Sequence, residues 1–149
     1  MERSNLMQPG AGHPIGGGIV LKVGADDSNH MSVFEITVPP GFDVGAHFHT
    51  AIEETFYVLE GSLNLQVGDE TGNGIGPGSF MFVPKGAAHR FWNDTDKPAR
   101  ILFISSPSGH ERYFEELAEI LRRPGPPDVD AIGSLRARYD TQQVSALAR

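Results

Sequence analysis

The chain of 149 residues contains no cysteine, so it has neither disulfides nor thiolate metal ligands, and cysteine gives no information about its redox compartment. It also has no apolar run of 18 residues, the length that crosses a bilayer. Its start, MERSNLMQPGAGHPIGGG, lacks the apolar core of a signal peptide. We therefore expect a cytoplasmic protein that has no contact with a membrane.

Positive charge is scarce as well. Twelve Lys and Arg against 19 Asp and Glu give a net charge of -7, and the basic residues form no long run. Phosphate binding requires concentrated positive charge. We therefore expect no nucleic-acid partner.

Glycine and proline are abundant, with 18 and 11 residues, and many of them separate short apolar runs. This texture is typical of many short strands with tight turns, and it predicts an all-β sandwich or small barrel in a single domain. The predicted strands are Ile19–Val23, Met31–Val38, Thr55–Leu59, Ser62–Val67 and the segments SFMFV, HRFW and ARILFI. The segment GDETGNGIGPG is predicted to be a turn-rich connector.

Two other segments flank the predicted barrel of residues 19–105. Residues 1–18 are Gly-rich and predict a flexible N-terminal arm, whereas residues 106–149 predict a helical tail. Helical spacing of apolar residues runs through SSPSGHERYFEELAEILRR, with Ser108 and Glu111 placed as a capping box. The apolar positions are Tyr113, Phe114, Leu117, Ile120 and Leu121. A second short helix is expected around Ala131 to Tyr139, and residues 141–149 are expected to fray.

Three histidines and a glutamate form a candidate metal site. His47 and His49 are two residues apart, so on a strand both imidazoles face the same side. Strand parity selects Glu54 over Glu53, which then faces solvent or a subunit contact. His89 enters a strand after a bend at Pro84 and Gly86. Three imidazoles and one carboxylate suit one divalent Fe, Mn, Ni, Co or Zn ion and leave coordination positions for water or substrate.

Two motifs of fixed spacing contain these residues. The first, G-x5-H-x-H-x4-E-x6-G, is filled by Gly41, His47, His49, Glu54 and Gly61. The second, G-x5-P-x-G-x2-H-x3-N, is filled by Gly78, Pro84, Gly86, His89 and Asn93. The chain thereby resembles the cupin superfamily, and in particular small quercetin-dioxygenase-like bacterial cupins.

The resemblance implies a double-stranded β-helix barrel with the four metal ligands at the wider end of its interior. It also implies a homodimer formed through sheet or N-terminal strand contacts. Asn93 and the motif glycines are expected to serve the structure rather than the chemistry. The one or two C-terminal helices are expected to pack on the outside of the barrel.

The expected cavity wall is apolar and aromatic, which favours a small apolar or aromatic substrate of the phenol or enol type over a sugar phosphate. By strand alternation its residues are Phe56, Val58, Phe91, Phe103 (or Leu102), Phe34 and Ile36. The leading hypothesis is a dioxygenase in which Glu54 binds the metal and acts as general base. A non-redox cyclase or isomerase such as a polyketide cyclase is an alternative, although one cyclase type of this superfamily has an all-histidine site, from which Glu54 departs. A non-enzymatic cupin that binds a small molecule is the third.

Overall fold

The computed structural model of the chain describes residues 4–144. In chain order its elements are β1 (His13–Gly16), β2 (Ile19–Val23), β3 (Ser32–Val38), β4 (His47–Phe48), β5 (Glu53–Glu60), β6 (Leu63–Val67), β7 (Glu70–Ile75), β8 (Phe80–Val83), β9 (His89–Trp92), β10 (Ala99–Ser106), α1 (Glu111–Leu121), α2 (Val129–Arg138) and β11 (Gln142–Gln143).

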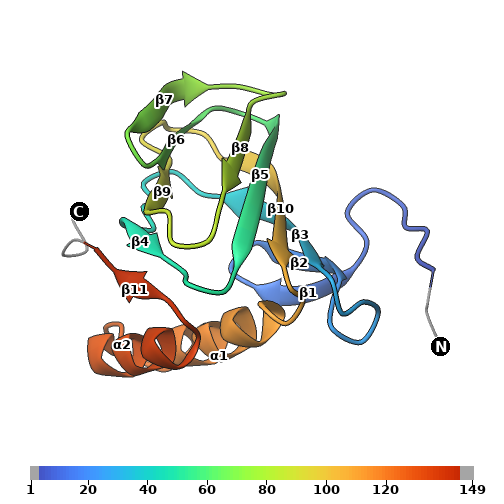
Figure 1. Cartoon of the computed structure of the whole chain (residues 1–149), viewed down its shortest axis with the longest axis vertical. Coiled ribbons are helices and arrows are strands. Elements are labelled where there is room, and N and C mark those ends of the chain that lie inside the picture. Colours follow the sequence, from blue (N-terminus) through green and yellow to red (C-terminus); the bar gives the residue numbers. More distant parts are fainter. Residues whose placement is uncertain (1–3, 145–149) are drawn as a thin grey trace.

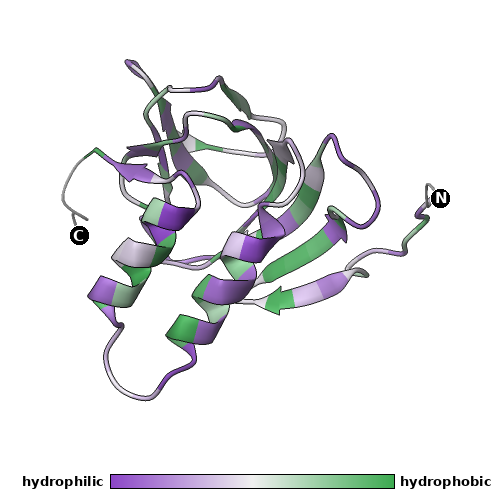
Figure 2. Cartoon of the chain, turned by 60° about the horizontal axis from the view of Figure 1, so that its bottom comes forward, coloured by the Kyte–Doolittle hydropathy of each residue, from purple (hydrophilic) through white to green (hydrophobic). Residues whose placement is uncertain are grey.

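Within these residues the strands form two antiparallel sheets, and the helices follow the last long strand. One sheet has the order β1-β2-β3-β10-β5-β8, and the other has the order β11-β4-β9-β6-β7. The helices α1 and α2 lie beneath the sheets in Figure 1, with α1 close to β1 and α2 below β11, and Figure 2 shows the two helices side by side. The predicted fold class, an all-β fold with C-terminal helices packed outside, is confirmed.

The interior of the first sheet is built in rows across β3, β10 and β5. Alternate residues of each strand are buried, as the period-2 pattern predicts. The register aligns Phe34, Phe103 and Phe56 in one row, with ring centroids 5.6 and 4.9 Å apart along it. The next row towards α1 is polar and consists of Ser32, Ser105 and Glu54. The aromatic core therefore ends at a polar layer on the side of the barrel that the helices cover.

Gly61 and Asn93, the last residues of the two motifs, have structural roles in the barrel. Gly61 has φ +78°, and a Cβ atom there would lie 2.8 Å from the Ala99 Cα and the Pro98 carbonyl oxygen, so only glycine fits. Asn93 is buried, and its Nδ2 donates to the main-chain oxygens of Val38 and Lys97 at 3.1 and 2.8 Å. Both residues hold the barrel together, in the structural role expected of them.

Two segments are more regular than the sequence predicts. The connector GDETGNGIGPG contains β7, which pairs with β6, because ladder hydrogen bonds override the low strand propensity of its glycines. Part of the predicted N-terminal arm is β1, which pairs with β2 in the first sheet. The prediction of a wholly irregular arm over residues 1–18 is therefore wrong, whereas the three-part division of the chain stays a prediction.

Helix α1 begins differently from the predicted capping box. Its N-cap residue is His110, which makes no side-chain capping hydrogen bond. Glu111 instead accepts hydrogen bonds from Ala25 N and Ser32 Oγ, both at 2.6 Å, because its side chain points to the barrel rather than back along the helix. Phe114 and Ala118 pack against the barrel core, whereas Leu121 is 55% exposed and leaves the predicted apolar face.

The second helix, α2, is confirmed and begins at an Asp128 N-cap whose side chain accepts from Ala131 N. Tyr113 and Ile120 of α1 pack with Leu135 of α2, so the two helices share a small core of their own. Figure 2 shows that hydrophilic and hydrophobic residues alternate around both helices. None of the helices in residues 4–144 is long and apolar enough to cross a membrane.

The segment after α2 is ordered as far as the structure describes it. Gln142 and Gln143 form β11, which pairs with Phe48 and His47 of β4. The predicted fraying is therefore wrong for these two residues, because β4 supplies the hydrogen-bonding edge. Residues 145–149 lie outside the described part of the chain.

Candidate metal centre

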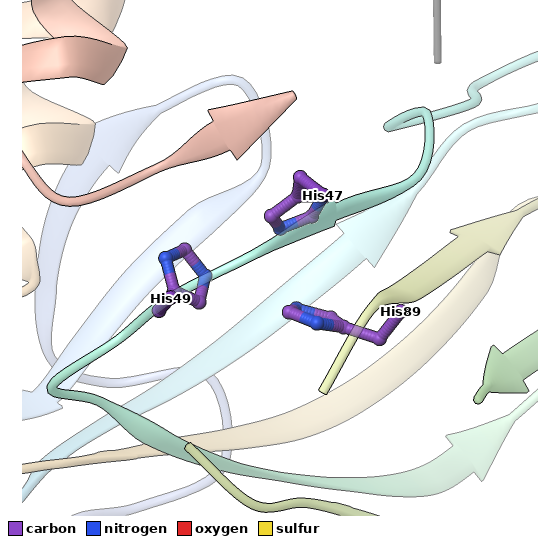
Figure 3. Close-up of side chains that lie close together, drawn as sticks. All are labelled: His47, His49 and His89. Atoms are coloured by element: carbon purple, nitrogen blue, oxygen red, sulfur yellow. The ribbon is translucent and has the colours of Figure 1, made fainter. Parts of the chain in front are cut away.

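The three candidate histidines lie together in the structure. Their ligand atoms all lie within 4.8 Å of one another, and all three side chains are buried. His47 begins β4 and His49 follows its end, whereas His89 begins β9 directly opposite His47. Figure 3 shows the three imidazoles pointing towards a common space between these strands. This cluster can hold a metal ion.

Each imidazole is fixed by a main-chain oxygen on its far side. Nδ1 of His47 lies 2.9 Å from the Gly45 oxygen, and Nδ1 of His89 lies 3.0 Å from the Ala87 oxygen. Nδ1 of His49 lies 2.9 Å from the Asp140 oxygen. A carbonyl oxygen only accepts, so Nδ1 carries the proton in each ring. The neutral ring then presents the lone pair of Nε2, the arrangement that orients metal-binding histidines.

Glu54 lies against two of these histidines. Its Oε1 is 2.9 Å from Nε2 of His49, and its Oε2 is 2.9 Å from Nε2 of His89. The carboxylate side chain is 3% exposed, whereas Glu53 is exposed, as strand parity predicts. The grouping of all four residues as one ligand set stays a prediction, since the mutual contacts of Glu54 reach two of the three imidazoles.

Comparison with known proteins identifies the architecture that carries this cluster. A family model for the cupin domain matches residues 34–105, which contain all four candidate ligands. These residues form a cupin domain. A protein with a double-stranded β-helix domain from Klebsiella pneumoniae, 17% identical, shares the fold with a TM-score of 0.56 over 72% of this chain and 93% of that one.

Sequence relatives of the cupin domain come from Streptomyces. The tetracenomycin polyketide synthase protein TcmJ of Streptomyces glaucescens is 35% identical over 72 residues, which is 48% of either chain. The polyketide synthase CurC of Streptomyces cyaneus is 35% identical over 68 residues, 46% of this chain and 44% of that protein. The chain thus spans about half the length of the curated relatives it matches.

The chemistry of the donor set in the cupin domain fits a divalent cation. Nε2 of His49 and Nε2 of His89 are buried and have no hydrogen-bond partner of suitable geometry, although each faces a Glu54 oxygen. A lone pair that faces a carboxylate oxygen at this distance is repelled unless a positive charge lies between them. Two ligand atoms that bind one ion at about 2.1 Å and at right angles lie about 3 Å apart, which agrees with these contacts.

Burial and the mutual contacts set the charges of the centre. Burial, with the neighbouring His89 as a second cause, lowers the pKa of His47 to about 4. Burial opposes ionisation of Glu54, but the adjacent His49 and His89 outweigh it and hold its pKa below the usual range when a proton or a metal ion lies between their Nε2 atoms and the carboxylate. Burial likewise opposes protonation of His49, but the Glu54 carboxylate outweighs it and raises that pKa. Glu54 is therefore ionised at neutral pH, and since a low pKa weakens a base, its role as general base stays a prediction.

The residues predicted as cavity wall all belong to one hydrophobic core of the cupin domain. Phe34, Ile36, Phe56, Val58 and Phe103 are buried in it, and the half-buried Phe91 packs against it. The ring of Phe56 lies 6.3 Å from the ring of His89, between centroids, and 5.5 Å from that of Phe91. Phe56 thus connects the core to the metal centre, and the role of the six residues as substrate wall stays a prediction.

Two polar residues next to the centre escaped the sequence analysis. Ser105 faces Glu54 in the β5–β10 register, and its buried Oγ has no hydrogen-bond partner. His110 is 8% exposed, and its ring centroid lies 5.8 Å from that of His49. Burial lowers the pKa of His110 to about 4, so the ring is neutral at neutral pH. Ser105 was visible as the inward position two residues after Phe103, whereas nothing in the local pattern marked His110.

The segment after α2 also reaches the centre. The Asp140 oxygen bonded to His49 belongs to this segment, and Thr141 Oγ1 lies 3.5 Å from the same Nδ1. Thr141 also lines a pocket of about 390 Å³ between α2 and β11. Local sequence patterns carry no signal for these two residues, because their contacts with His49 span 91 and 92 residues of chain.

Proposed function

We propose that the chain is a metal-dependent cupin that closes a ring in a polyketide-type substrate without net oxidation or reduction. The observation that carries this proposal is the set of three fixed imidazoles, two of which, His49 and His89, face the Glu54 carboxylate through Nε2. The substrate class is supported by the relatives TcmJ and CurC, which are both polyketide synthase proteins. The cyclase alternative of the sequence analysis is therefore preferred here to the dioxygenase.

The residues of the candidate metal centre would have different roles in this reaction. His47, His49 and His89 would hold a divalent ion through Nε2, with Glu54 as an oxygen ligand. When bound, such an ion supplies Lewis-acid polarisation of a substrate carbonyl. Glu54 Oε2 or Oε1 is the carboxylate oxygen that can accept the proton released when the substrate forms its enolate. In an aldol closure the enolate carbon then bonds to a second carbonyl carbon, whose oxygen takes up a proton.

The surroundings of the centre favour an uncharged substrate that carries oxygen. Ser105 Oγ and the neutral His110 ring offer hydrogen bonds beside Glu54, and the aromatic row begins one layer further in. Among the described residues, no Lys or Arg is buried in the interior. A phosphate group would enter this interior without a counter-charge, which is costly. A substrate with a keto or enol oxygen on an aromatic framework would place its oxygen beside the polar groups and its rings against the aromatic row.

A dioxygenase acting on a phenol or enol is the second candidate, because imidazole and carboxylate ligands suit redox-active ions as well as zinc. A cupin that binds such a molecule without converting it is the third. All three share the metal centre and the same kind of ligand. They differ in the product.

One experiment separates them. Protein purified without added metal is analysed for Fe, Mn, Ni, Co and Zn, and is then incubated with a partly cyclised aromatic polyketide ketone while dissolved oxygen is recorded. Ring closure with loss of water and no oxygen uptake supports the cyclase. A product that has gained both atoms of O2 supports the dioxygenase, and binding without product supports the third reading. Protein that stays free of metal after soaking with these ions would contradict both enzymes.

A further inference from the structure

His49 differs from the other two histidines in where its second hydrogen bond comes from. The partners of His47 and His89 are the carbonyls two residues earlier in the chain, Gly45 and Ala87. Both of these lie in the same strand-and-turn units as the histidines themselves. The partner of His49 is the Asp140 carbonyl, 91 residues away and beyond both helices. The orientation of one candidate ligand therefore depends on a segment outside the cupin domain.

Asp140 has an unusual backbone that the end of α2 explains. Its φ is +53°, in the left-handed region. It directly follows the C-cap Tyr139, and Thr141 N donates to the Arg136 oxygen at 2.9 Å. This is a Schellman ending, in which the left-handed position is usually glycine. Helix termination thus accounts for the conformation, but it does not account for an aspartate there.

The carboxylate of Asp140 has a different task. One oxygen accepts from Thr50 N at 2.9 Å and from Ala51 N at 2.8 Å, and the other accepts from Thr50 Oγ1 at 2.7 Å. Thr50 directly follows His49, and the turn that it begins leads into β5 and Glu54. The side chain and the carbonyl of one residue therefore hold both His49 and the turn between two candidate ligands.

The strand after Asp140 reinforces this contact. Within the described residues β4 spans His47 and Phe48, and β11 supplies the pairing on one of its sides. Val144 N and Gln143 Nε2 both donate to the Ala46 oxygen, at 3.0 Å each. The segment of residues 139–144, which we call the tail segment, is thus bound along β4 and to His49 directly after it.

We propose that Asp140 is a positioning residue of the metal centre, which fixes the His49 tautomer with its carbonyl and clamps the following turn with its carboxylate. This inference rests on the proposed metal dependence, but it adds a residue outside residues 34–105, which carry the family match. Asp140 contacts the candidate ligand His49 and the turn that follows it, so it acts on the centre through these groups.

The test replaces Asp140 with glycine, the residue that suits the left-handed position best. If Asp140 serves only to end α2, Asp140→Gly leaves metal binding unchanged. If it positions His49, Zn(II) affinity measured by competition with a chromophoric chelator falls roughly 10- to 100-fold, the loss typical of partners that orient metal ligands. Tyr139→Phe is the matched control: it removes the neighbouring hydrogen bond to Glu116 and leaves His49 untouched, so its Zn(II) affinity should equal that of the wild type.

A second variant separates geometry from charge. Asp140→Asn tolerates the left-handed backbone and keeps an acceptor for Thr50 and Ala51, but it removes the negative charge. We expect its loss of affinity to be smaller than that of Asp140→Gly. Equal losses would show that charge alone acts, and would overturn the positioning role.

Proton-exchange NMR of the zinc-loaded protein supplies a readout that a purely structural role does not move. In the wild type the Asp140 carbonyl should protect the His49 Nδ1–H proton from exchange with solvent, whereas in Asp140→Gly, which keeps the carbonyl but loses the clamp on the turn, this proton should exchange faster. Equally slow exchange in both proteins, or unchanged Zn(II) affinity, overturns the proposal. Wild type that binds Zn(II) but forms no cyclised product contradicts the proposed function alone, whereas wild type that binds no Zn(II) contradicts both.

Discussion

A neutral imidazole has one donor nitrogen and one acceptor nitrogen, and the main chain decides which is which for His47, His49 and His89. Because all three Nδ1 atoms are bonded to carbonyls, the acceptor nitrogens gather on the inside with the Glu54 carboxylate. Acceptors without donors are unfavourable in a buried site. At the scale of single residues, the centre is thus prepared for a positive charge.

Removing one imidazole should therefore abolish stoichiometric metal binding. We expect His47→Ala to lose more Zn(II) affinity than the roughly 10- to 100-fold typical of outer partners, since it deletes a ligand. His30 is exposed and far from the centre in the sequence, so His30→Ala serves as control. The metal content of both variants is measured after dialysis. Equal content in the two variants would contradict a role for His47 as ligand.

Glu54 and Glu53 form a natural pair for testing the carboxylate. Glu54→Gln keeps an oxygen ligand but cannot accept a proton, so we expect metal to be retained and turnover of the polyketide ketone to fall by roughly 10²- to 10⁴-fold. Glu53→Gln changes an exposed residue of the same strand and should leave turnover unchanged. Rates under substrate saturation provide the comparison. Similar rates in both variants would remove Glu54 from the chemistry.

Parity within a strand explains which site residues could be predicted. The spacing of His47 and His49, and the choice of Glu54 over Glu53, follow from the two-residue repeat and need no knowledge of the fold. His110 and Asp140 reach the centre through contacts between segments far apart in the chain, and a local pattern carries no information on such contacts. The local residues of the site were thus accessible from sequence, and its distant partners were not.

At the scale of elements, Glu111 connects α1 to the barrel. The residue is 6% exposed, and its carboxylate accepts from Ala25 N and Ser32 Oγ. Ser32 belongs to the polar row that ends at Glu54. The sequence placed Glu111 correctly in the first turn of a helix but assigned it to a capping box. Ala25 N and Ser32 Oγ of the barrel donate to Glu111, so the predicted capping box with Ser108 does not form.

Loss of that charge should weaken the fold in a pH-dependent way. Burial opposes ionisation of Glu111, but the bonds from Ser32 and Ala25 outweigh it and lower its pKa. The stabilisation is therefore complete above the ordinary pKa of an unfolded glutamate, and it is lost as the pH falls through the lower folded value.

We expect Glu111→Gln to reduce the free energy of unfolding by about 1–3 kcal/mol at neutral pH. The difference from wild type should shrink in acid. Denaturant titrations at both pH values measure this. Glu115→Gln, which alters an exposed residue of the same helix, should give no such difference. A Glu111→Gln deficit that does not depend on pH would contradict the role of the charge.

At the scale of the whole molecule, one outer face of the first sheet is aromatic. Tyr57, Phe80 and Phe82 are 42%, 62% and 45% exposed, and the β5–β8 register brings Tyr57 next to Phe80. Buried Met81 and Val83 alternate with the two phenylalanines, so these point outwards together. An exposed aromatic patch of this kind is typical of surfaces that bind a partner.

The homodimer expected from the sequence would find its sheet contact here. We predict that Phe80→Glu and Phe82→Glu each shift the protein towards the monomer in sedimentation velocity, because a charge then enters the buried interface. Val129 of α2 is 70% exposed, and Val129→Glu should not change the association state. Wild type that sediments as a monomer, or a dimer that tolerates both phenylalanine changes, would contradict this prediction.

The hydrogen bond from His49 to Asp140 also imposes an order in time. A ribosome makes the chain from the N-terminus, so residues 34–105 and every candidate ligand exist before Asp140 has been synthesised. During that interval His49 lacks the carbonyl that orients its ring. If the centre binds a metal as we propose, firm metal loading would follow the docking of α1, α2 and β11.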